Sequence, residues 1–259
     1  MHQNRMRRAI AGLPLGEVQF FDQVGSTNDV ALAWAMEGAP DLSLVYAEMQ
    51  TAGRGRGTHR WLTPPASALA FSIILRSPET LSESLSHFTG LGAVAVCEAL
   101  ESLGLSPQIK WPNDVLLNRR KAGGILTEAI WLGETLESVV IGIGLNVKAR
   151  SVPPPEQVAF PATCVENETG RKVDRPRLLR EILRSFLYWR EHLDDPSFLQ
   201  AWEKRLAFIG EEIEIFNGER TLQVGVVQGL DIDGSLRLLS SSGEIVKIQV
   251  GEVHLRSLV

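Results

Sequence analysis

The chain is organised around the stretch EMQTAGRGRG at residues 48–57, in which two arginines alternate with three glycines. Apolar, strand-like runs at 42–46 and 69–75 flank it, so the stretch is predicted to be a loop between two strands. Glycine lets the backbone approach a ligand closely, and arginine offers forked donors to a phosphate or a carboxylate. The pattern favours a loop that wraps an anion. On this stretch alone, a mobile surface loop or an RNA-binding arginine-glycine segment explains it equally well.

The residues before this loop are predicted to form a short strand and then a helix. A short polar arm leads into a strand-like segment at 18–21. The run Ser26 to Asp29 stands directly before apolar residues that begin at Val30, which is typical of a capped helix start. The first two residues of that run are therefore expected where a loop meets a helix N-terminus.

The residues after the loop mix helical and strand patterns. Apolar side chains recur at helical spacing over 91–103, and Gly104 is the expected C-cap. The segment 151–161 contains four prolines and predicts a surface loop. Strands are expected at 108–111, 124–130 and 136–146, and amphipathic helices at 177–193 and 198–208. This mixture indicates the α+β fold class.

From Gly210 onward the pattern changes to short alternating strands. The expected turns are Asn217-Gly218, Asp233-Gly234 and Ser242-Gly243. A module of about 50 residues is too small to hold a large core alone, so it is expected to dock on the rest of the chain. The predicted division is therefore 1–209 for a main domain and 210–259 for a small all-β domain.

Composition excludes several classes of protein. A formal net charge of -5 and a pI near 5.6 argue against a broad nucleic-acid-binding face. Cys97 and Cys164 lie far apart, without the spacing of a disulfide framework or a zinc site. No apolar signal-peptide core follows the N-terminal arginines, and no apolar stretch reaches the roughly 18 residues of a membrane span. A cytoplasmic protein, neither exported nor membrane-spanning, is expected.

Two further stretches carry residue types suited to binding and catalysis. Lysines, an Asn-Asp pair and two glycines occur within 110–128, and could bring cations, a metal-binding carboxylate and close-approach backbone into one pocket. Glycines alternate along the apolar segment 141–147, which also contains Asn146, an amide able to pair with adenine. Taken singly, a proline turn with a hairpin explains the first stretch and a glycine-bearing core strand explains the second.

Together, the order and spacing of these stretches resemble biotin protein ligases. The resemblance rests on Gly25 to Asn28, Gln50 through Arg56 with Trp61, Lys110 to Asp114, Lys121 to Leu126, Gly142 to Asn146, and the final 251–256. It implies a catalytic domain related to class II aminoacyl-tRNA synthetases and a small C-terminal SH3-like β-barrel. It also implies ATP-dependent ligation of biotin to a lysine through biotinyl-5′-AMP, and the short form that lacks an N-terminal DNA-binding domain.

The resemblance also implies roles for individual residues. The residues expected to contact biotin are Ser26, Thr27, Asn28, Gln50, Arg54, Gly55, Arg56, Lys121 and Gly124. Those expected to bind ATP or the adenylate are Arg54, Arg56, Trp61, Lys110, Lys121 and Asn146. Arg54, Arg56, Lys110 and Lys121 are expected to be catalytic through charge and positioning, because no residue looks like a covalent nucleophile. Asp114 is expected to help bind Mg²⁺, and the glycine-rich loop is expected to order over bound ligand.

The chain departs from the family pattern at 57–60, where relatives carry a further glycine and arginine before the tryptophan. His59 stands where a second basic phosphate contact is often found, and histidine is only partly charged near neutral pH. Either Arg60 substitutes for that contact, or ATP is held less tightly. His59 as an exposed loop residue is the third interpretation.

Three other functions compete with the biotin ligase. A lipoate ligase would catalyse the same type of reaction, but the polar Ser26, Thr27 and Gln50 suit a ureido ring better than a dithiolane. A biotin-sensing repressor would need a DNA-binding domain, and only about twenty residues precede the first core strand. A non-catalytic biotin binder would not need the charged loop and lysines. A biotin carboxyl carrier protein is the expected acceptor, DNA binding is not expected, and a homodimer is an open expectation.

Overall fold

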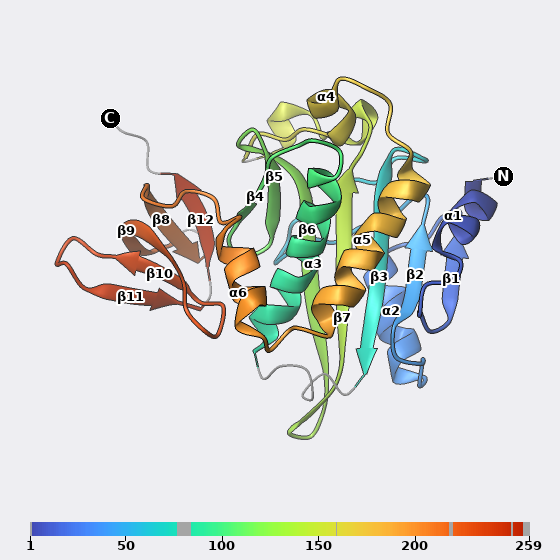
Figure 1. Ribbon diagram of the computed structural model, residues 1–259, viewed down its shortest axis with the longest axis horizontal. Helices are drawn as coiled ribbons and strands as arrows, with labels where there is room; N and C mark the ends of the chain where they lie inside the picture. Colours follow the sequence, from blue (N-terminus) through green and yellow to red (C-terminus); the bar gives the residue numbers. More distant parts are fainter. Residues whose placement is uncertain (1, 77–83, 159, 218–219, 250, 256–259) are drawn as a thin grey trace.

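The computed structural model describes residues 2–76, 84–158, 160–217, 220–249 and 251–255 (Figure 1). The helices are α1 His2–Ile10, α2 Thr27–Met36, α3 Leu85–Glu101, α4 Val165–Thr169, α5 Arg175–Arg190 and α6 Pro196–Glu203, with 3-10 turns η2 Ala149–Ser151 and η3 Pro155–Gln157. The strands are β1 Val18–Phe21, β2 Ser43–Ala47, β3 Ala68–Arg76, β4 Pro107–Lys110, β5 Asp114–Leu117, β6 Arg120–Leu132, β7 Thr135–Asn146, β8 Glu212–Asn217, β9 Arg220–Leu230, β10 Leu236–Leu239, β11 Ile245–Ile248 and β12 Glu252–Leu255.

The larger sheet has seven strands in the order β1-β2-β3-β7-β6-β5-β4. Only β1 and β2 pair in parallel, and the remaining neighbours are antiparallel. Side chains alternate between its two faces because of the pleat. In β2, for example, Leu44 and Tyr46 pack into the core that includes α3 and α5, while Val45 packs with the alanines of α2. Helices therefore cover both faces, with α3 and α5 in front of the sheet in Figure 1.

The predicted strands are confirmed within a few residues, but β5 was not predicted. The helices predicted at 91–103 and 198–208 are present with shifted ends, because α3 begins at Leu85 and α6 ends at Glu203. The N-terminal segment, described from the sequence only as a short polar arm, forms α1, whose Met6 and Ile10 are buried one turn apart. Helix α3 ends at Glu101, before the expected cap; Gly104 follows with φ +85° and donates its N–H to the Glu101 carbonyl. Ser26 is the N-cap residue of α2, but its side chain makes no capping hydrogen bond.

The smaller sheet has five strands in the order β11-β10-β9-β8-β12, all antiparallel. The turns at Asp233-Gly234 and Ser242-Gly243 are confirmed, whereas Gly218 of the third expected turn lies outside the described residues. The Asp233-Gly234 turn docks on the larger domain: Trp111 Nε1 donates to the Gly234 carbonyl at 3.0 Å, and Ser84 Oγ donates to the Asp233 carbonyl at 2.6 Å. The expected docking is therefore observed.

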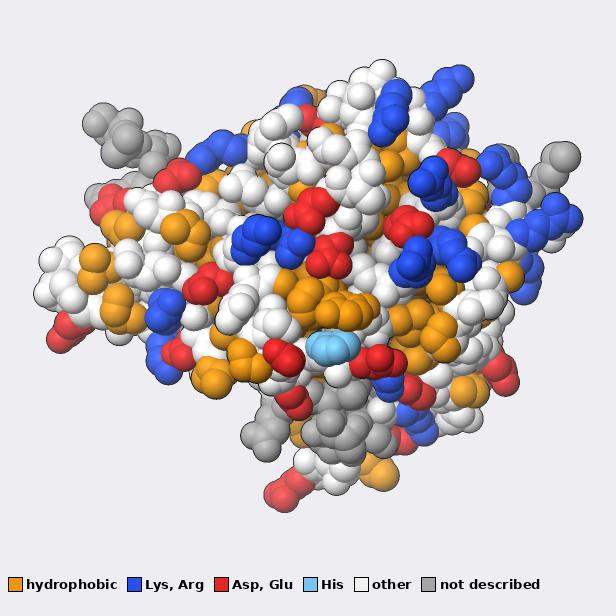
Figure 2. All heavy atoms as spheres, in the orientation of Figure 1, with side chains coloured by type: hydrophobic (Ala, Val, Ile, Leu, Met, Phe, Trp, Pro, Cys, Tyr) orange, Lys and Arg blue, Asp and Glu red, His pale blue; other side chains and the backbone are white. Residues whose placement is uncertain are grey.

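The surface matches the near-balanced charge of the sequence. On the face shown in Figure 2, basic and acidic side chains are interspersed, and neither sign forms a continuous field over the described residues. Within the described ranges, no helix combines the length and the apolar character that crossing a bilayer would require.

Candidate active site

A cavity of about 570 Å³ opens where the N-terminus of α2, the 50–62 loop, the turn before β5 and strands β6 and β7 meet. The proline-containing 151–162 segment covers one side, and Val253 of the smaller sheet reaches the rim. All thirteen of the predicted site residues line this cavity: Ser26, Thr27, Asn28, Gln50, Arg54, Gly55, Arg56, Trp61, Lys110, Asp114, Lys121, Gly124 and Asn146. The fold thus brings together residues that are up to 120 positions apart in the sequence (26 to 146).

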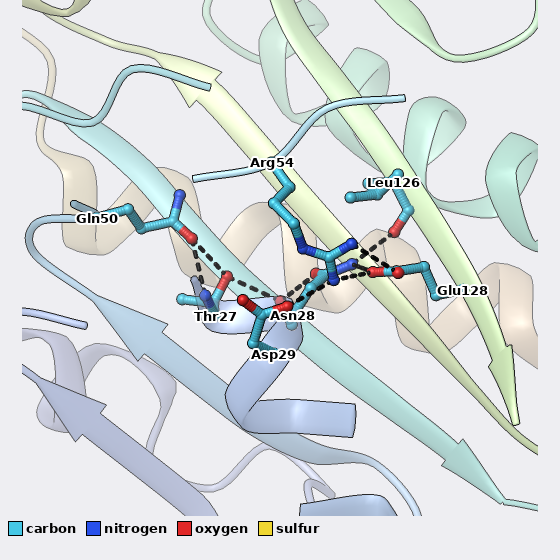
Figure 3. Close-up of polar contacts among 8 residues, drawn as sticks. Thr27, Asn28, Asp29, Gln50, Arg54, Leu126 and Glu128 are labelled. Carbon is cyan, nitrogen blue, oxygen red and sulfur yellow. Dashed lines mark hydrogen bonds and ion pairs between the residues drawn. The ribbon is translucent and has the colours of Figure 1, made fainter. Parts of the chain in front are cut away.

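A chain of polar contacts forms one wall of the cavity. Gln50 Oε1 accepts from the backbone N–H of Thr27 at 2.8 Å and lies 3.1 Å from its hydroxyl. The Ser72 hydroxyl lies 2.9 Å from Thr27 Oγ1 and 2.6 Å from Asn28 Oδ1. Gln50 Nε2 donates to Thr63 Oγ1 at 3.1 Å. Figure 3 shows the side chains of Thr27 and Asn28 of α2 and of Gln50 of the loop lying close to one another beside the sheet.

Sequence analysis missed Ser72, although one signal was available. It is a lone hydroxyl residue inside the otherwise apolar strand β3, and it is fully buried. A buried hydroxyl needs a hydrogen-bond partner, and Ser72 finds Thr27 and Asn28.

The oxygen–oxygen contacts among these side chains outnumber the hydroxyl hydrogens that can occupy them. Three oxygen–oxygen contacts join Gln50, Thr27, Ser72 and Asn28, and only the two hydroxyls can supply a hydrogen to them. The two amide oxygens are fixed as acceptors, because the Asn28 Nδ2 group donates to Leu126 O and Glu128, and Gln50 Oε1 accepts from a backbone N–H. One contact therefore always lacks a hydrogen. Of the four residues, Gln50, Thr27 and Asn28 line the cavity, and their oxygens keep lone pairs to which a ligand N–H can donate.

The two terminal nitrogens of Arg54 are not available to a ligand in the cavity, because both are bound to protein carboxylates. Its Nη1 and Nη2 donate to the two oxygens of Glu128 at 2.8 and 2.7 Å, and Nη2 also lies 2.7 Å from Asp29 Oδ1 (Figure 3). The hydrogen bond to Glu128 raises the pKa of the Arg54 guanidinium, so it stays charged. Sequence analysis named Arg54 but not Glu128, because the two stand 74 positions apart.

The glycine-rich loop forms a short hairpin. The backbone N–H of Trp61 donates to Gly53 O at 2.9 Å, and that of Gly55 donates to His59 O at 2.8 Å. Arg56 lies toward the hairpin tip, and its Nη1 donates to the Gly251 carbonyl of the smaller sheet at 3.0 Å. Both His59 and Arg60 line the cavity and are exposed, so the alternatives for replacing the second basic phosphate contact stay predictions.

A lysine–aspartate–lysine cluster lies on another side of the cavity. Lys121 Nζ is 2.5 Å from Asp114 Oδ1, and Lys110 Nζ is 3.3 Å from Oδ2. Burial alone would raise the pKa of Asp114, but the charges of Lys121 and Lys110 outweigh it and hold the pKa below its ordinary value. The cluster therefore carries one net positive charge. Lys110 also lies over the ring of Phe160, a cavity residue that sequence analysis missed.

The donor set does not form a resident metal site. Both Asp114 oxygens are paired with lysines, and within the described ranges no group of three or more His, Cys, Asp or Glu residues could hold a metal ion. A single carboxylate cannot form an all-protein metal cage, whereas Mg²⁺ is usually held by one or two carboxylates together with substrate phosphates and water.

Two glycines of β7 have no side chain, and this leaves room for other protein side chains to pack against the sheet. A Cβ at Gly144 would lie 2.4 Å from Trp61 Cε2, so the indole lies flat against this residue. A Cβ at Gly142 would lie 2.0 Å from Asn28 Oδ1. Asn146, expected to pair with adenine, is 3% exposed and donates through Nδ2 to Thr163 O at 3.1 Å. Its amide is thus already anchored beside the cavity.

The sequence of this chain is similar to those of biotin and lipoate protein ligases. The model of the biotin/lipoate A/B protein ligase family matches residues 20–146. A biotin–[acetyl-CoA-carboxylase] ligase of Paracoccus denitrificans is 35% identical over 230 residues, covering 85% of this chain and 94% of the relative. The bifunctional ligase/repressor BirA of Bacillus subtilis is 34% identical over 243 residues, covering 91% of this chain and 73% of the relative.

Among solved structures, the biotin protein ligase of Aquifex aeolicus in complex with biotin and ATP superposes with a TM-score of 0.78. It is 29% identical, and the match covers 93% of this chain and 98% of that one.

Proposed function

Because this chain belongs to the biotin/lipoate A/B protein ligase family, we propose that it joins biotin to a specific lysine of a biotin carboxyl carrier protein. The chain has the class II synthetase-like α+β fold of these ligases. The enzyme is a biotin–[biotin carboxyl-carrier protein] ligase: it consumes ATP, forms biotinyl-5′-AMP and releases pyrophosphate and then AMP.

The polar wall of Gln50, Thr27, Ser72 and Asn28 carries the substrate assignment. It presents oxygen acceptors to the cavity, and a ureido ring offers two N–H donors and one carbonyl acceptor. The dithiolane of lipoate has no N–H to give. A site whose buried acceptors are left unpaired rejects the ligand that lacks the donor. This supports biotin over lipoate as the acid.

In the first step a carboxylate oxygen of biotin attacks the α-phosphorus of ATP, and pyrophosphate leaves. Two anions must approach each other, so cationic side chains lower the barrier. We assign this role to Arg56, Lys110 and Lys121. Asp114 holds the two lysines at one place and keeps them from repelling each other. Trp61 and Asn146 border the place proposed for the adenylate.

In the second step the lysine amine of the carrier attacks the carbonyl carbon of the mixed anhydride, and AMP leaves. No covalent enzyme intermediate is needed. The contribution of the chain is to position the anhydride and exclude water from it. We propose that Mg²⁺ enters with the phosphates of ATP, since Asp114 alone does not form a metal site.

The remaining assignments are proposals of the same kind. Residues 1–209 form the catalytic domain, and 210–259 form the SH3-like domain that closes one side of the cavity. The two buried free thiols, Cys97 and Cys164, suit a cytoplasmic enzyme. We propose a homodimer on the family resemblance, and the absence of DNA binding on the net charge of the chain.

Pyrophosphate exchange into ATP tests the proposal. The purified protein with Mg²⁺ is assayed with biotin, with lipoate and with no acid. Exchange with biotin alone is expected. Exchange with lipoate would reassign the enzyme to the sister activity, and no exchange with either acid would leave a non-catalytic biotin binder.

A further inference from the structure

Arg54 lies in the ligand loop, but its charge is directed at two protein carboxylates. Glu128 binds it with two parallel hydrogen bonds, and Asp29 adds a third contact at 2.7 Å. The side chains of Arg54 and Glu128 are 36% and 24% exposed, so solvent screens this pair less than it screens a fully exposed one. A phosphate could take the edge formed by Nη1 and Nη2 only by displacing Glu128 from it, and Nε is the one nitrogen of this guanidinium that is buried without a hydrogen-bond partner among the described residues.

We propose that Glu128, assisted by Asp29, is the anchor of the 53–61 hairpin, and that Arg54 is a positioning residue and not a phosphate ligand. This inference rests on the proposed biotin ligase function. It assigns a role to Glu128, which belongs to strand β6 and forms no part of the glycine-rich stretch.

The anchor acts at the base of the hairpin. Gly53, adjacent to Arg54, accepts the backbone N–H of Trp61, and a β-bridge pairs Arg54 with Arg60. Fixing Arg54 to β6 therefore fixes where Trp61 meets Gly144 and where the tip with Arg56 extends over the cavity. A bidentate arginine–carboxylate pair sets direction as well as distance, which a lysine could not do.

The anchor also joins the loop to the polar wall of the cavity. Asn28 Nδ2 donates to Glu128 Oε2 at 2.8 Å, the same oxygen that accepts from Arg54 Nη2 (Figure 3). The contacts run without a break from Gln50 through Thr27, Ser72 and Asn28 to Glu128 and Arg54. The acid-binding wall and the phosphate-facing loop are thus held by one carboxylate.

A double-mutant cycle in the full chain tests the assignment with Arg54→Ala, Glu128→Ala and the double variant. Each single variant is expected to lower kcat/KM in pyrophosphate exchange by about 10-fold, as a small misplacement of the loop does. The double variant is expected to be no worse than the more impaired single variant, because both changes release the same anchor and Glu128 also holds Asn28. A double variant 10-fold worse than either single variant would overturn the proposal.

Limited trypsin digestion of the ligand-free variants gives a second readout that a phosphate ligand would not move. Cleavage after Arg56 and Arg60 is expected to accelerate in Arg54→Ala and Glu128→Ala, while the Tm changes little. Unchanged cleavage in both variants would count against an anchor, whatever the exchange rates are. Arg54→Lys, which keeps the charge but loses the fork, should restore only part of the protection.

Glu137→Ala is the matched control, because it removes another partly exposed carboxylate–arginine pair, with Arg76, on the neighbouring strand β7. It should leave exchange and cleavage at parental levels. If the parent itself shows no exchange, the proposed function fails, but the digestion pattern still decides whether Glu128 anchors the hairpin.

Discussion

Asp114 shows how one buried carboxylate can organise two cations. Its side chain is only 10% exposed, and each of its oxygens faces a lysine. Such a group is costly to bury alone but is stabilised when both partners are present. The same lysines that keep it ionised are thereby preorganised for a polyanionic ligand, which needs cations that do not have to be gathered during the reaction.

Asp114→Asn is expected to destabilise the fold by about 3 kcal/mol at neutral pH, because it leaves two lysines beside an uncharged amide. Urea unfolding measures the difference, with the exposed Asp194→Asn as control. An unchanged urea midpoint in the variant would show that the cluster contributes nothing to stability.

The same pair of proteins gives a pH test. The folded pKa of Asp114 is lowered, so its stabilising contribution is present above its unfolded pKa and is lost as pH falls through the folded pKa. The difference in unfolding free energy between parent and Asp114→Asn should therefore shrink below about pH 4. A difference that grows on acidification would contradict the pairing.

At the scale of elements, strand β7 explains why two glycines alternate there. Gly142 and Gly144 face α2 and the ligand loop, and their missing side chains make room for Asn28 and Trp61. From the sequence taken alone, a glycine-bearing core strand was the expected explanation of this alternation. The structure shows close packing by the protein's own side chains.

Gly144→Ala should push the Trp61 indole off the sheet, because the new methyl would lie 2.4 Å from Cε2. We expect at least about a 10-fold loss in pyrophosphate exchange from the displaced loop. The expected cost in stability is about 1 to 3 kcal/mol, as for other overpacked sites. Tryptophan fluorescence and the exchange assay measure the two effects.

Gly92→Ala is the control for overpacking alone. Its new methyl would lie 3.0 Å from Ile125 Cγ2, in the core between α3 and the sheet and away from Trp61. It should cost stability without a comparable loss of exchange. Parental exchange in Gly144→Ala would show that the position of Trp61 is unimportant.

At the scale of the whole molecule, the smaller sheet docks through the Asp233-Gly234 turn and through contacts of β9 and β10 with Glu203 of α6. At the docking turn, Trp111, in the turn between β4 and β5, donates to Gly234 O. The smaller sheet also meets the active-site loop, where the Gly251 carbonyl accepts from Arg56. The docking turn and the loop contact lie at separate places on this small domain. A rotation about the docking turn would therefore move Gly251 relative to Arg56.

Trp111→Phe removes the donor to Gly234 O and should destabilise the protein by about 1 to 2 kcal/mol, because a buried carbonyl loses its partner. Hydrogen exchange should increase around 231–235. Trp131→Phe, at a residue 54% exposed, is the matched control and should change neither quantity. Equal stability of the two variants would mean that this hydrogen bond does not hold the docking turn.

The sequence by itself determined most of the strands, the long helices and thirteen residues that line the cavity, but not β5, Ser72, Glu128 or Phe160. Apolar periodicity is a local property, so β3, β7 and α5 were found close to their observed bounds. Glycine, arginine, lysine and asparagine at fixed spacing carry chemistry that can be recognised without coordinates. The helix α1 was missed because its apolar face consists of only two buried side chains, Met6 and Ile10, among charged neighbours.

Only the tertiary structure decided which partners these residues have. Glu128 meets Arg54 across 74 positions, and Ser72 meets Asn28 across 44, because β3 and β6 flank β7 in the sheet and α2 lies against it. Strand order depends on packing between distant segments, which local pattern does not encode. Whether a charged residue faces a ligand or another side chain follows from that packing. At Arg54, the packing places the guanidinium against the Glu128 carboxylate.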